Sequence, residues 1–427
     1  MKKIKLYLPF GLSLKEVIFL LFLISVSGFS TIIQLISLFI FALVFLFFGR
    51  KIKFINRWFF YFSLLIISSV QLVFIWKTDY SINYIINTLL MTFMWFLAFQ
   101  SSNIVVKNVF ELEGLKIEKI LKIFFKINLF LVIIQIVIMC IDMKTLLPFA
   151  NMSAGDNVKG LFRNSSVNMI IMSFYAVFFM FKKDHINAVI AFTVMILTFY
   201  MSGLLLFLSV FLFYAFIKFS FERKIKIILG SVLVLFLFAQ LSPDNVDYVK
   251  HILNDKISSK TDPPRKLVSF GQTFNNWTSN PISFVFGTGG GKFSSRTAFI
   301  TAGEYVSWFP EKLTYISEDF NDNHFQLWNS KILSISFKDG TSNQPFSSYN
   351  KIVGEYGLLG IVLFMIYLSS SIKYYRHLTY GKIIFLLIFA YFLLDYWFEY
   401  FSVIVFFELF LLLDIKNHLK NKTINDE

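Results

Sequence analysis

Residues 16–48 read EVIFLLFLISVSGFSTIIQLISLFIFALVFLFF, and this run decides the fold. As one helix it would be about 50 Å long at 1.5 Å per residue, against about 30 Å of hydrocarbon in a bilayer. We therefore predict two short membrane helices with a break at Gly28, Phe29 and Ser30. Residues 382–414 are equally long and apolar, and here the charges and aromatic residues between Asp395 and Glu399 predict the break.

The composition of the whole chain agrees with this interpretation. Of 427 residues, 56% are hydrophobic and only 15% are charged, so no soluble core could bury all of the apolar runs. A lipid-facing backbone must satisfy its own hydrogen bonds, and the alternation of barrel strands is absent. The predicted fold class is an all-α polytopic membrane protein with about twelve transmembrane helices. The expected spans are 14–28, 31–48, 58–76, 82–100, 120–141, 164–182, 186–202, 204–220, 225–241, 350–370, 381–396 and 399–415.

The basic residues predict the orientation. A net charge of +14 is also found in nucleic-acid-binding proteins, but the 40 Lys and Arg residues lie mainly at the ends of apolar runs, so no nucleic acid is expected. With twelve spans and the N-terminus inside, most of them fall on the cytoplasmic side, as the positive-inside rule requires. The short outer loops then hold only Lys77, Lys144, Lys159 and Arg163. Both termini are therefore expected in the cytoplasm.

A long polar stretch separates the ninth and tenth spans. Residues 1–241 hold helices one to nine, residues 242–349 form an extracytoplasmic loop domain, residues 350–415 hold the last three helices, and residues 416–427 form a cytoplasmic tail. Cys140 is the single cysteine, so the loop has no disulfide. We expect short helices there, and its aromatic residues either pack a modest core or rest on the membrane surface. These residues are Trp277, Trp308, Phe309, Phe325 and Trp328.

The loop carries the first candidate site. Arg265 precedes an amphipathic stretch, which is followed by the glycine cluster Gly287, Gly289, Gly290 and Gly291. Such a cluster lets backbone N–H groups approach an anion closely, although a flexible turn has the same pattern. The nucleotide-binding motif GxxxxGK[ST] is absent, so no nucleotide site is expected.

Two further stretches complete a family pattern. KGLFRNSSVN (159–168) presents Arg163 before the sixth span, and YNKIVGEYGLLG (349–360) opens the tenth. With the glycine segment they resemble the Wzy-type O-antigen polymerase and O-antigen ligase family, in which an Arg precedes an "fG.G.g.f" stretch in a large loop and "E.GllG" marks the return to the membrane. GLFRNSSVN is similar to that family's "G.f.npN" stretch. Ligases of the family usually carry a His-Asn pair before "E.GllG", and the SYN at 348–350 therefore favours a polymerase.

The resemblance implies polymerisation of undecaprenyl-pyrophosphate-linked oligosaccharide into O-antigen or capsular polysaccharide at the outer face of the bacterial inner membrane. The alternatives are an O-antigen ligase, a flippase or transporter of the same lipid-linked oligosaccharide, or a sensor or assembly scaffold. Few intramembrane charges, no visible internal repeat and the long loop favour the enzyme over the flippase. The expected partners are the lipid-linked oligosaccharide, the bilayer, and a chain-length regulator and flippase of the same pathway, with no cofactor and no metal.

That chemistry needs cations beside the leaving pyrophosphate, and Arg binds phosphate oxygens bidentately. We expect Arg265 and Arg163 to act as this clamp, with Arg296, Gly287, Gly289 and Gly290 binding substrate. Each arginine has an alternative as a surface cation that meets lipid headgroups or a loop carboxylate.

The chemistry also needs a group that accepts a hydroxyl proton, and the sequence offers two candidates. His324 has acidic neighbours that could orient it, but a lone loop histidine is also common as a structural residue. Glu355 could serve instead, or it could face the dipole at the start of a helix. Asp395 and Glu399 either bind a cation or sugar or mark a turn. Glu408 should face the bundle interior, because a carboxylate in lipid is costly.

Overall fold

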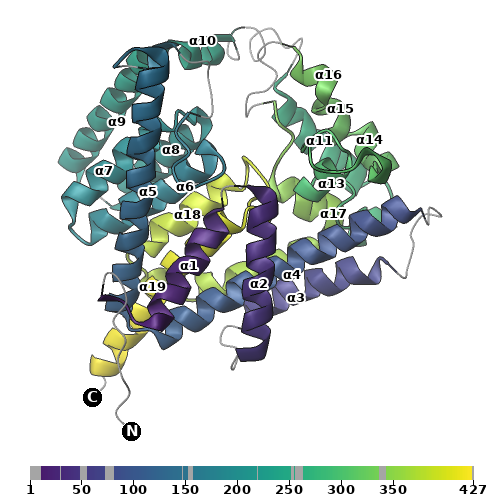
Figure 1. Cartoon of the computed structure of the whole chain (residues 1–427), viewed down its shortest axis with the longest axis horizontal. Helices are drawn as coiled ribbons and strands as arrows, with labels where there is room; N and C mark the ends of the chain where they lie inside the picture. Colours follow the sequence, from purple (N-terminus) through teal and green to yellow (C-terminus); the bar gives the residue numbers. More distant parts are fainter. Residues whose placement is uncertain are drawn as a thin grey trace.

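The computed structural model describes residues 11–28, 30–48, 55–72, 81–146, 148–151, 157–218, 220–251, 254, 263–335 and 343–425. Over these ranges the chain is helical and forms no β-strand (Figure 1). Together with the apolar character of the helices, this makes the chain a helical membrane protein, as the sequence predicts.

Each predicted span contains a helix. These helices are α1 (Leu14–Ser27), α2 (Thr31–Phe48), α3 (Ile55–Val70), α4 (Ile82–Glu111), α5 (Gly114–Met143), α6 (Ser165–Phe181), α7 (His185–Leu197), α8 (Met201–Lys218), α9 (Phe221–Leu241), α17 (Ser348–Ile372), α18 (Gly381–Tyr391) and α19 (Phe401–Asn425). The expected span 58–76 runs past α3 into residues 73–76, which lie outside the described residues.

Within the described residues, five helical stretches are long and apolar enough to cross a membrane: Ile82–Glu111, Gly114–Met143, Met201–Lys218, Lys224–Leu241 and Ser348–His377. Several others are apolar but shorter. The count of twelve spans and the orientation of the termini stay predictions.

Both predicted breaks in the long apolar runs are confirmed. α1 ends at Ser27, and Gly28 follows with a φ of +39°, a conformation that favours glycine, before α2 starts at Thr31. α18 ends at Tyr391, and a short 3₁₀ helix, η6 (Trp397–Glu399), precedes α19. Asp395 and Glu399 therefore mark a turn rather than one face of a continuous helix.

Residues 242–349, the predicted loop domain, form short helices as predicted, and their last two residues already belong to α17. α10 (Pro243–His251) extends from the end of α9, whereas the others gather beside the start of α17 (Figure 1). These are α11 (Arg265–Trp277), α12 (Pro281–Phe286), α13 (Arg296–Thr301), η4 (Glu311–Leu313), α14 (Glu318–Asp322), α15 (His324–Leu327) and α16 (Ser330–Leu333).

Aromatic rings pack the core of this long segment. The ring of Phe299 lies 4.7 Å from Phe320, 4.8 Å from Phe346 and 5.6 Å from Trp328. Phe346 in turn lies 4.7 Å from Tyr396 in the turn before α19, so the segment is seated on the helix bundle. Of the two alternatives that the sequence left open, a packed core or the membrane surface, Trp328 thus lies in a packed core.

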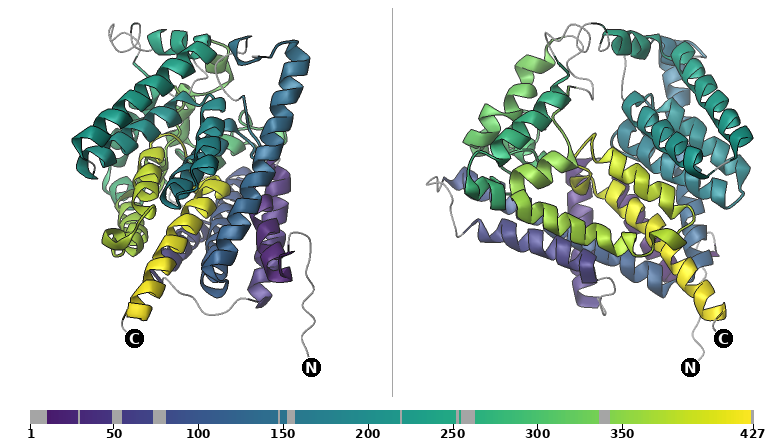
Figure 2. Two further views of the ribbon diagram at one scale, coloured as in Figure 1. Left: turned by 90° about the vertical axis from the view of Figure 1, so that its left-hand side faces the viewer. Right: turned by 180° about the vertical axis from the view of Figure 1, so that it is seen from behind.

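α19 is the central helix of the bundle, and it packs against α1, α4, α6 and α18 (Figure 2). Its residues 401–415 are all buried. Glu408 lies among them, at 0% exposure, and its carboxylate pairs with Arg57 of α3 at 3.5 Å. Tyr61, Tyr367 and Ser102 donate hydrogen bonds to the same carboxylate. The expectation that Glu408 faces the bundle interior is confirmed.

Candidate anion-binding site

The site is built on a kink in α17. Gly357 has a φ of +58° and a ψ of −147°, which interrupts the helix. Just before the interruption, the carbonyls of Gly354 and Glu355 accept hydrogen bonds from the backbone N–H groups of Thr288 and Gly289 at 2.9 and 3.0 Å. The glycine segment is thereby attached to α17 by its backbone.

Close backbone contact explains the glycines at this junction. A Cβ on Gly287 would lie 2.4 Å from the carbonyl carbon of Glu355, and a Cβ on Gly357 would lie 2.6 Å from the backbone nitrogen of Gly287. Both residues also have positive φ. Two of the three stretches that carry the family resemblance, the glycine segment and residues 349–360, therefore meet here.

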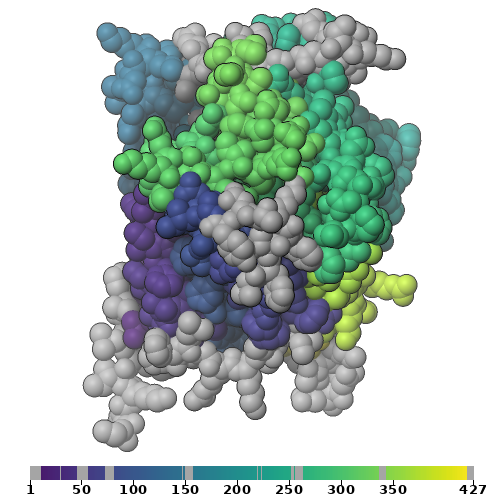
Figure 3. Space-filling model, turned by 90° about the vertical axis from the view of Figure 1, so that its right-hand side faces the viewer, coloured from purple at the N-terminus to yellow at the C-terminus, as the bar shows by residue number. Residues whose placement is uncertain are grey.

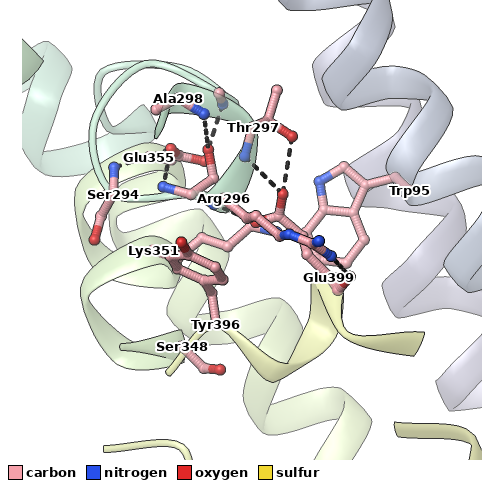
Figure 4. Close-up of polar contacts among 12 residues, drawn as sticks. Trp95, Ser294, Arg296, Thr297, Ala298, Ser348, Lys351, Glu355, Tyr396 and Glu399 are labelled. Atoms are coloured by element: carbon pink, nitrogen blue, oxygen red, sulfur yellow. Dashed lines mark hydrogen bonds and ion pairs between the residues drawn. The ribbon is translucent and has the colours of Figure 1, made fainter. Parts of the chain in front are cut away.

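The carboxylate of Glu355 fills the concave turn of the glycine segment. It accepts hydrogen bonds from the backbone N–H groups of Gly291, Phe293, Ser294 and Ser295, at 2.9 to 3.2 Å (Figure 4). A series of N–H groups of this kind is a general anion-binding arrangement. Here the bound anion is a side chain of the protein itself.

The amides of the predicted substrate-binding glycines have partners within the chain. Gly287 N–H donates to the carbonyl of Ser283, Gly289 N–H to that of Glu355, and Gly290 N–H to Oε1 of Gln71. These contacts hold the segment in place. They favour a structural role for Gly287, Gly289, Gly290 and Glu355, while substrate binding and proton transfer by these residues remain untested predictions.

A second carboxylate, Glu399, binds the first turn of α13. It accepts hydrogen bonds from the N–H groups of Arg296 and Thr297 at 3.0 and 2.9 Å, and from the Thr297 hydroxyl at 2.8 Å (Figure 4). Lys351 of α17 pairs with the same carboxylate at 2.9 Å, and its ammonium group lies 4.1 Å from the Trp95 ring centre. Glu399 and Lys351 are both buried and form a neutral pair. The hydrogen bonds from Arg296 and Thr297 to Glu399 join the long segment to the bundle.

Two arginine side chains meet at one hydroxyl, that of Thr31. Nη2 of Arg296 donates to Oγ1 of Thr31 at 3.3 Å, and Nη1 of Arg163 donates to the same oxygen. Arg296 is 1% exposed and Arg163 is partly buried. Within the described residues neither guanidinium forms an ion pair with a carboxylate. Two like charges therefore meet at Thr31, and neither has an ion-pair partner among the described residues.

Tyrosine rings line the site around Arg296. The guanidinium carbon lies 4.5 Å from the ring centre of Tyr400 and 6.0 Å from that of Tyr305, and the two hydroxyls are 2.8 Å apart. Nη1 donates to the backbone carbonyl of Glu399 at 3.3 Å, and Nε is buried without a hydrogen-bond partner. One donor of this buried cation is thus unused.

Three amide side chains in the helices position Arg163. Asn128 accepts from the N–H of Leu161, Gln135 accepts from two further N–H groups of the loop, and Asn168 donates to the carbonyl of Val158. Asn128 and Asn168 are also bonded to each other at 3.1 Å. Residues 158–161, just before Arg163, are therefore held against α5 and α6 by these hydrogen bonds.

Arg265 belongs to the same long segment but not to the Thr31 contact. It is the first residue of α11, and its Nη1 donates to the carbonyl of Leu327 at 2.9 Å. The next residue, Trp328, lies 5.6 Å from Tyr305, which faces Arg296. The structure thus brings Arg163 and Arg296 together and places Arg265 farther along the same packed cluster.

His324 is buried, and both of its ring nitrogens have partners. Nε2 lies 3.1 Å from the carbonyl of Ser269 and 3.1 Å from the Thr273 hydroxyl, and Nδ1 lies 3.0 Å from the Ser294 hydroxyl. A carbonyl only accepts, so Nε2 carries the proton and Nδ1 accepts. Burial lowers the pKa of His324 from 6.5 to about 4. These contacts favour a structural role for His324, and its role as a base stays a prediction.

Asp395 is the acidic side chain at this junction that keeps an oxygen free. Oδ1 accepts from the N–H of Tyr396 at 2.7 Å, and Oδ2 accepts no hydrogen bond from any described residue. Lys266, whose ammonium group donates to the carbonyls of Phe346 and Leu394, is an electrostatic neighbour of Asp395, as is Arg296. Burial lowers the pKa of Lys266 to about 7.

No protein-family model matches this chain, and no curated protein and no solved structure is similar to it. By its fold, the chain is a helical membrane protein with a buried cationic site between its helix bundle and its long segment.

Sequence reasoning missed Thr31 and Lys351. Thr31 gave no signal, because a threonine at the start of an apolar run is unremarkable. Lys351 did give one, since a cation inside a predicted span (350–370) is costly and calls for a partner. Glu399 was noticed, but its partners come from distant parts of the chain.

Proposed function

We propose that the protein is a glycosyltransferase that polymerises undecaprenyl-pyrophosphate-linked oligosaccharide at the outer face of a bacterial inner membrane, with twelve spans and both termini in the cytoplasm. The observation that supports this best is the pair of guanidinium groups at Thr31, neither of which has an ion-pair partner among the described residues. A pyrophosphate carries the charge that such a pair lacks, and arginine suits its oxygens.

In the proposed reaction, a sugar hydroxyl of one repeat attacks the anomeric carbon of a lipid-linked chain. The new C–O bond forms as the bond from that carbon to the pyrophosphate oxygen breaks, and the electron pair leaves with the pyrophosphate. Arg163 and Arg296 stabilise the charge that develops on this leaving group. Asp395 accepts the hydroxyl proton, since its Oδ2 has no hydrogen-bond partner among the described residues, whereas His324 and Glu355 are fully engaged.

The test uses a strain that lacks the gene and is complemented with single variants. Arg163→Ala, Arg296→Lys and Asp395→Asn should leave single-repeat product and abolish long chains, with normal amounts of protein in the membrane. Arg296→Lys keeps the charge but loses the planar donor set. Lys312→Ala removes an exposed cation of the same segment and should have no effect.

Normal long-chain polysaccharide in the Arg163→Ala and Arg296→Lys strains would rule out this site. Failure of lipid-linked repeats to reach the outer face would instead indicate a flippase, and loss of polymer attachment to lipid A would indicate a ligase.

A further inference from the structure

The helix α11 has an inverted distribution of polar and apolar residues. Leu267 and Phe274 are 62% and 58% exposed, and Phe270 lies between them on the same face. Ser269 and Thr273 point the other way, are buried, and contact His324. A helix at a water-facing surface normally buries its apolar face, whereas α11 exposes its apolar face and buries its polar one.

α12 continues this apolar surface. None of its residues is buried, and Ile282, Phe284, Val285 and Phe286 are between 38% and 53% exposed. The Trp277 ring stacks on Phe284 at 4.9 Å and so connects the two helices. We call this surface the α11–α12 patch, formed by Leu267, Phe270, Phe274, Trp277, Ile282, Phe284, Val285 and Phe286.

The adjoining span, α17, shows too little apolar surface to cross a bilayer alone. Its exposed residues begin at Leu358, continue with Val362 and Met365, and end at Ile372 before Lys373. At 1.5 Å per residue, this stretch is about 22 Å long, whereas the hydrocarbon is about 30 Å thick. About 8 Å of hydrocarbon must therefore meet another part of the protein.

α12 covers α17 at the point where this exposed surface stops. A Cβ on Gly357 would lie 2.8 Å from both the carbonyl oxygen of Phe284 and the carbonyl carbon of Val285. Residues 348–357 of α17 are buried or partly buried. In Figure 3 the teal-green surface of the α11–α12 region lies next to the yellow-green surface of α17.

We propose that the α11–α12 patch is inserted in the hydrocarbon of the bilayer leaflet on its side of the membrane, where it extends the lipid-facing surface of α17. A contiguous exposed apolar surface of this kind marks an interaction site. Lipid is the occupant that also accounts for the missing thickness at α17. The polar face of α11, with Lys266, Ser269 and Thr273, is then held at the membrane surface beside the cationic site.

Spin labels in the full chain, reconstituted into phosphatidylcholine and phosphatidylglycerol vesicles, test this proposal. In a Cys140→Ser background, single cysteines replace Phe274 and Val285, with Met365 as the lipid-facing control and Lys312 as the water-facing control. Because all four side chains are exposed, the labels disturb no core contact. The measurement is the accessibility of each label to oxygen, which concentrates in lipid, and to a polar nickel chelate, which does not.

At Phe274 and Val285 the ratio of oxygen to nickel accessibility should match that at Met365 and exceed that at Lys312 several-fold. A ratio equal to that at Lys312 would show that the patch faces water and overturn the proposal. Low accessibility to both reagents, with dipolar broadening between labels of different molecules, would show that a second copy covers the patch and would overturn it equally. Neither result depends on the proposed glycosyltransferase activity.

Discussion

Two carboxylates decide how the long segment attaches to the bundle. Glu355 and Glu399 each bind backbone N–H groups at the start of α13, and neither has a carboxylate oxygen directed to a guanidinium group. Backbone N–H groups hold Glu355, and backbone N–H groups, the Thr297 hydroxyl and Lys351 hold Glu399, so among the described residues the guanidinium of Arg296 has no ion-pair partner. The contacts of Glu355, Gly287, Gly289 and Gly290 favour a structural role for residues that the sequence predicts in a substrate site.

Glu355→Gln should destabilise the protein. The substitution puts an amide NH₂ among four N–H donors, so at least one buried donor loses its acceptor, at a cost of roughly 3 kcal/mol. The measurement is the thermal unfolding temperature of the detergent-solubilised protein. Glu311→Gln, at an exposed position, is the control, and equal stability of the two variants would contradict the role assigned to Glu355.

His324 should make stability depend on pH. Its pKa falls from 6.5 to about 4 on burial, so the unfolded chain binds the proton first as the pH decreases. The free energy of unfolding is therefore highest above pH 6.5 and decreases as the pH falls towards 4. The decrease is about 2 kcal/mol at pH 5. The unfolding temperature of the wild type should therefore drop more between pH 8 and pH 5 than that of His324→Gln.

The matched control for this prediction is His185→Gln, because His185 is exposed. This variant should keep the pH dependence of the wild type. An identical pH profile for His324→Gln and the wild type would show that His324 is not buried as a neutral group.

At the scale of elements, the kink in α17 is what admits the glycine segment. A straight helix would use the carbonyls of Gly354 and Glu355 internally, and Thr288 and Gly289 would lose their acceptors. The kink also brings α12 against α17, and so defines where the span stops being exposed.

Gly357→Ala should disrupt this junction. A methyl group would meet the backbone of Gly287 at 2.6 Å, and the positive φ is itself strained for alanine, at a cost of about 1–3 kcal/mol. The expected results are a lower unfolding temperature and loss of long-chain product. Gly230→Ala lies in α9 with nothing within 4 Å of the new methyl group and should not destabilise the protein. Wild-type stability of Gly357→Ala would refute the kink.

At the scale of the whole molecule, buried polar contacts to α19 connect distant helices. Arg57 of α3 reaches Glu408 of α19, and donates in addition to Ser370 and Ser371 of α17. α19 is the final described helix of the chain and also its centre, so the bundle closes only when this helix is in place.

Glu408→Leu alone should lower folded yield sharply, because it leaves the Arg57 charge buried without its partner, a loss of about 3–5 kcal/mol. The double variant Arg57→Met with Glu408→Leu should recover part of the yield, because it removes the unpaired buried charge. The recovery is incomplete because the hydroxyls of Tyr61, Tyr367 and Ser102 still lose their acceptor. The measurement is the monodisperse fraction in detergent chromatography. A double variant no better than the single one would show that the two residues act independently.

The sequence by itself determined the helical membrane class, the breaks in both long apolar runs and the short helices of residues 242–349. These follow from local properties: the length of an apolar run, a glycine or a charge within it, and the need of a backbone in lipid to bond to itself. The inward position of Glu408 follows from the same cost of charge in lipid.

The tertiary structure alone decided the composition of the site. Arg163, Arg296 and Thr31 lie far apart in the chain, and no local pattern states that one hydroxyl will receive both guanidinium groups. The glycine cluster left an anion site and a flexible turn open, and the anion bound by the amides of Gly291 and residues 293–295 is the side chain of Glu355, two residues before the kink at Gly357. Pairing between distant residues depends on packing, and packing is not encoded in the spacing of residues along the chain.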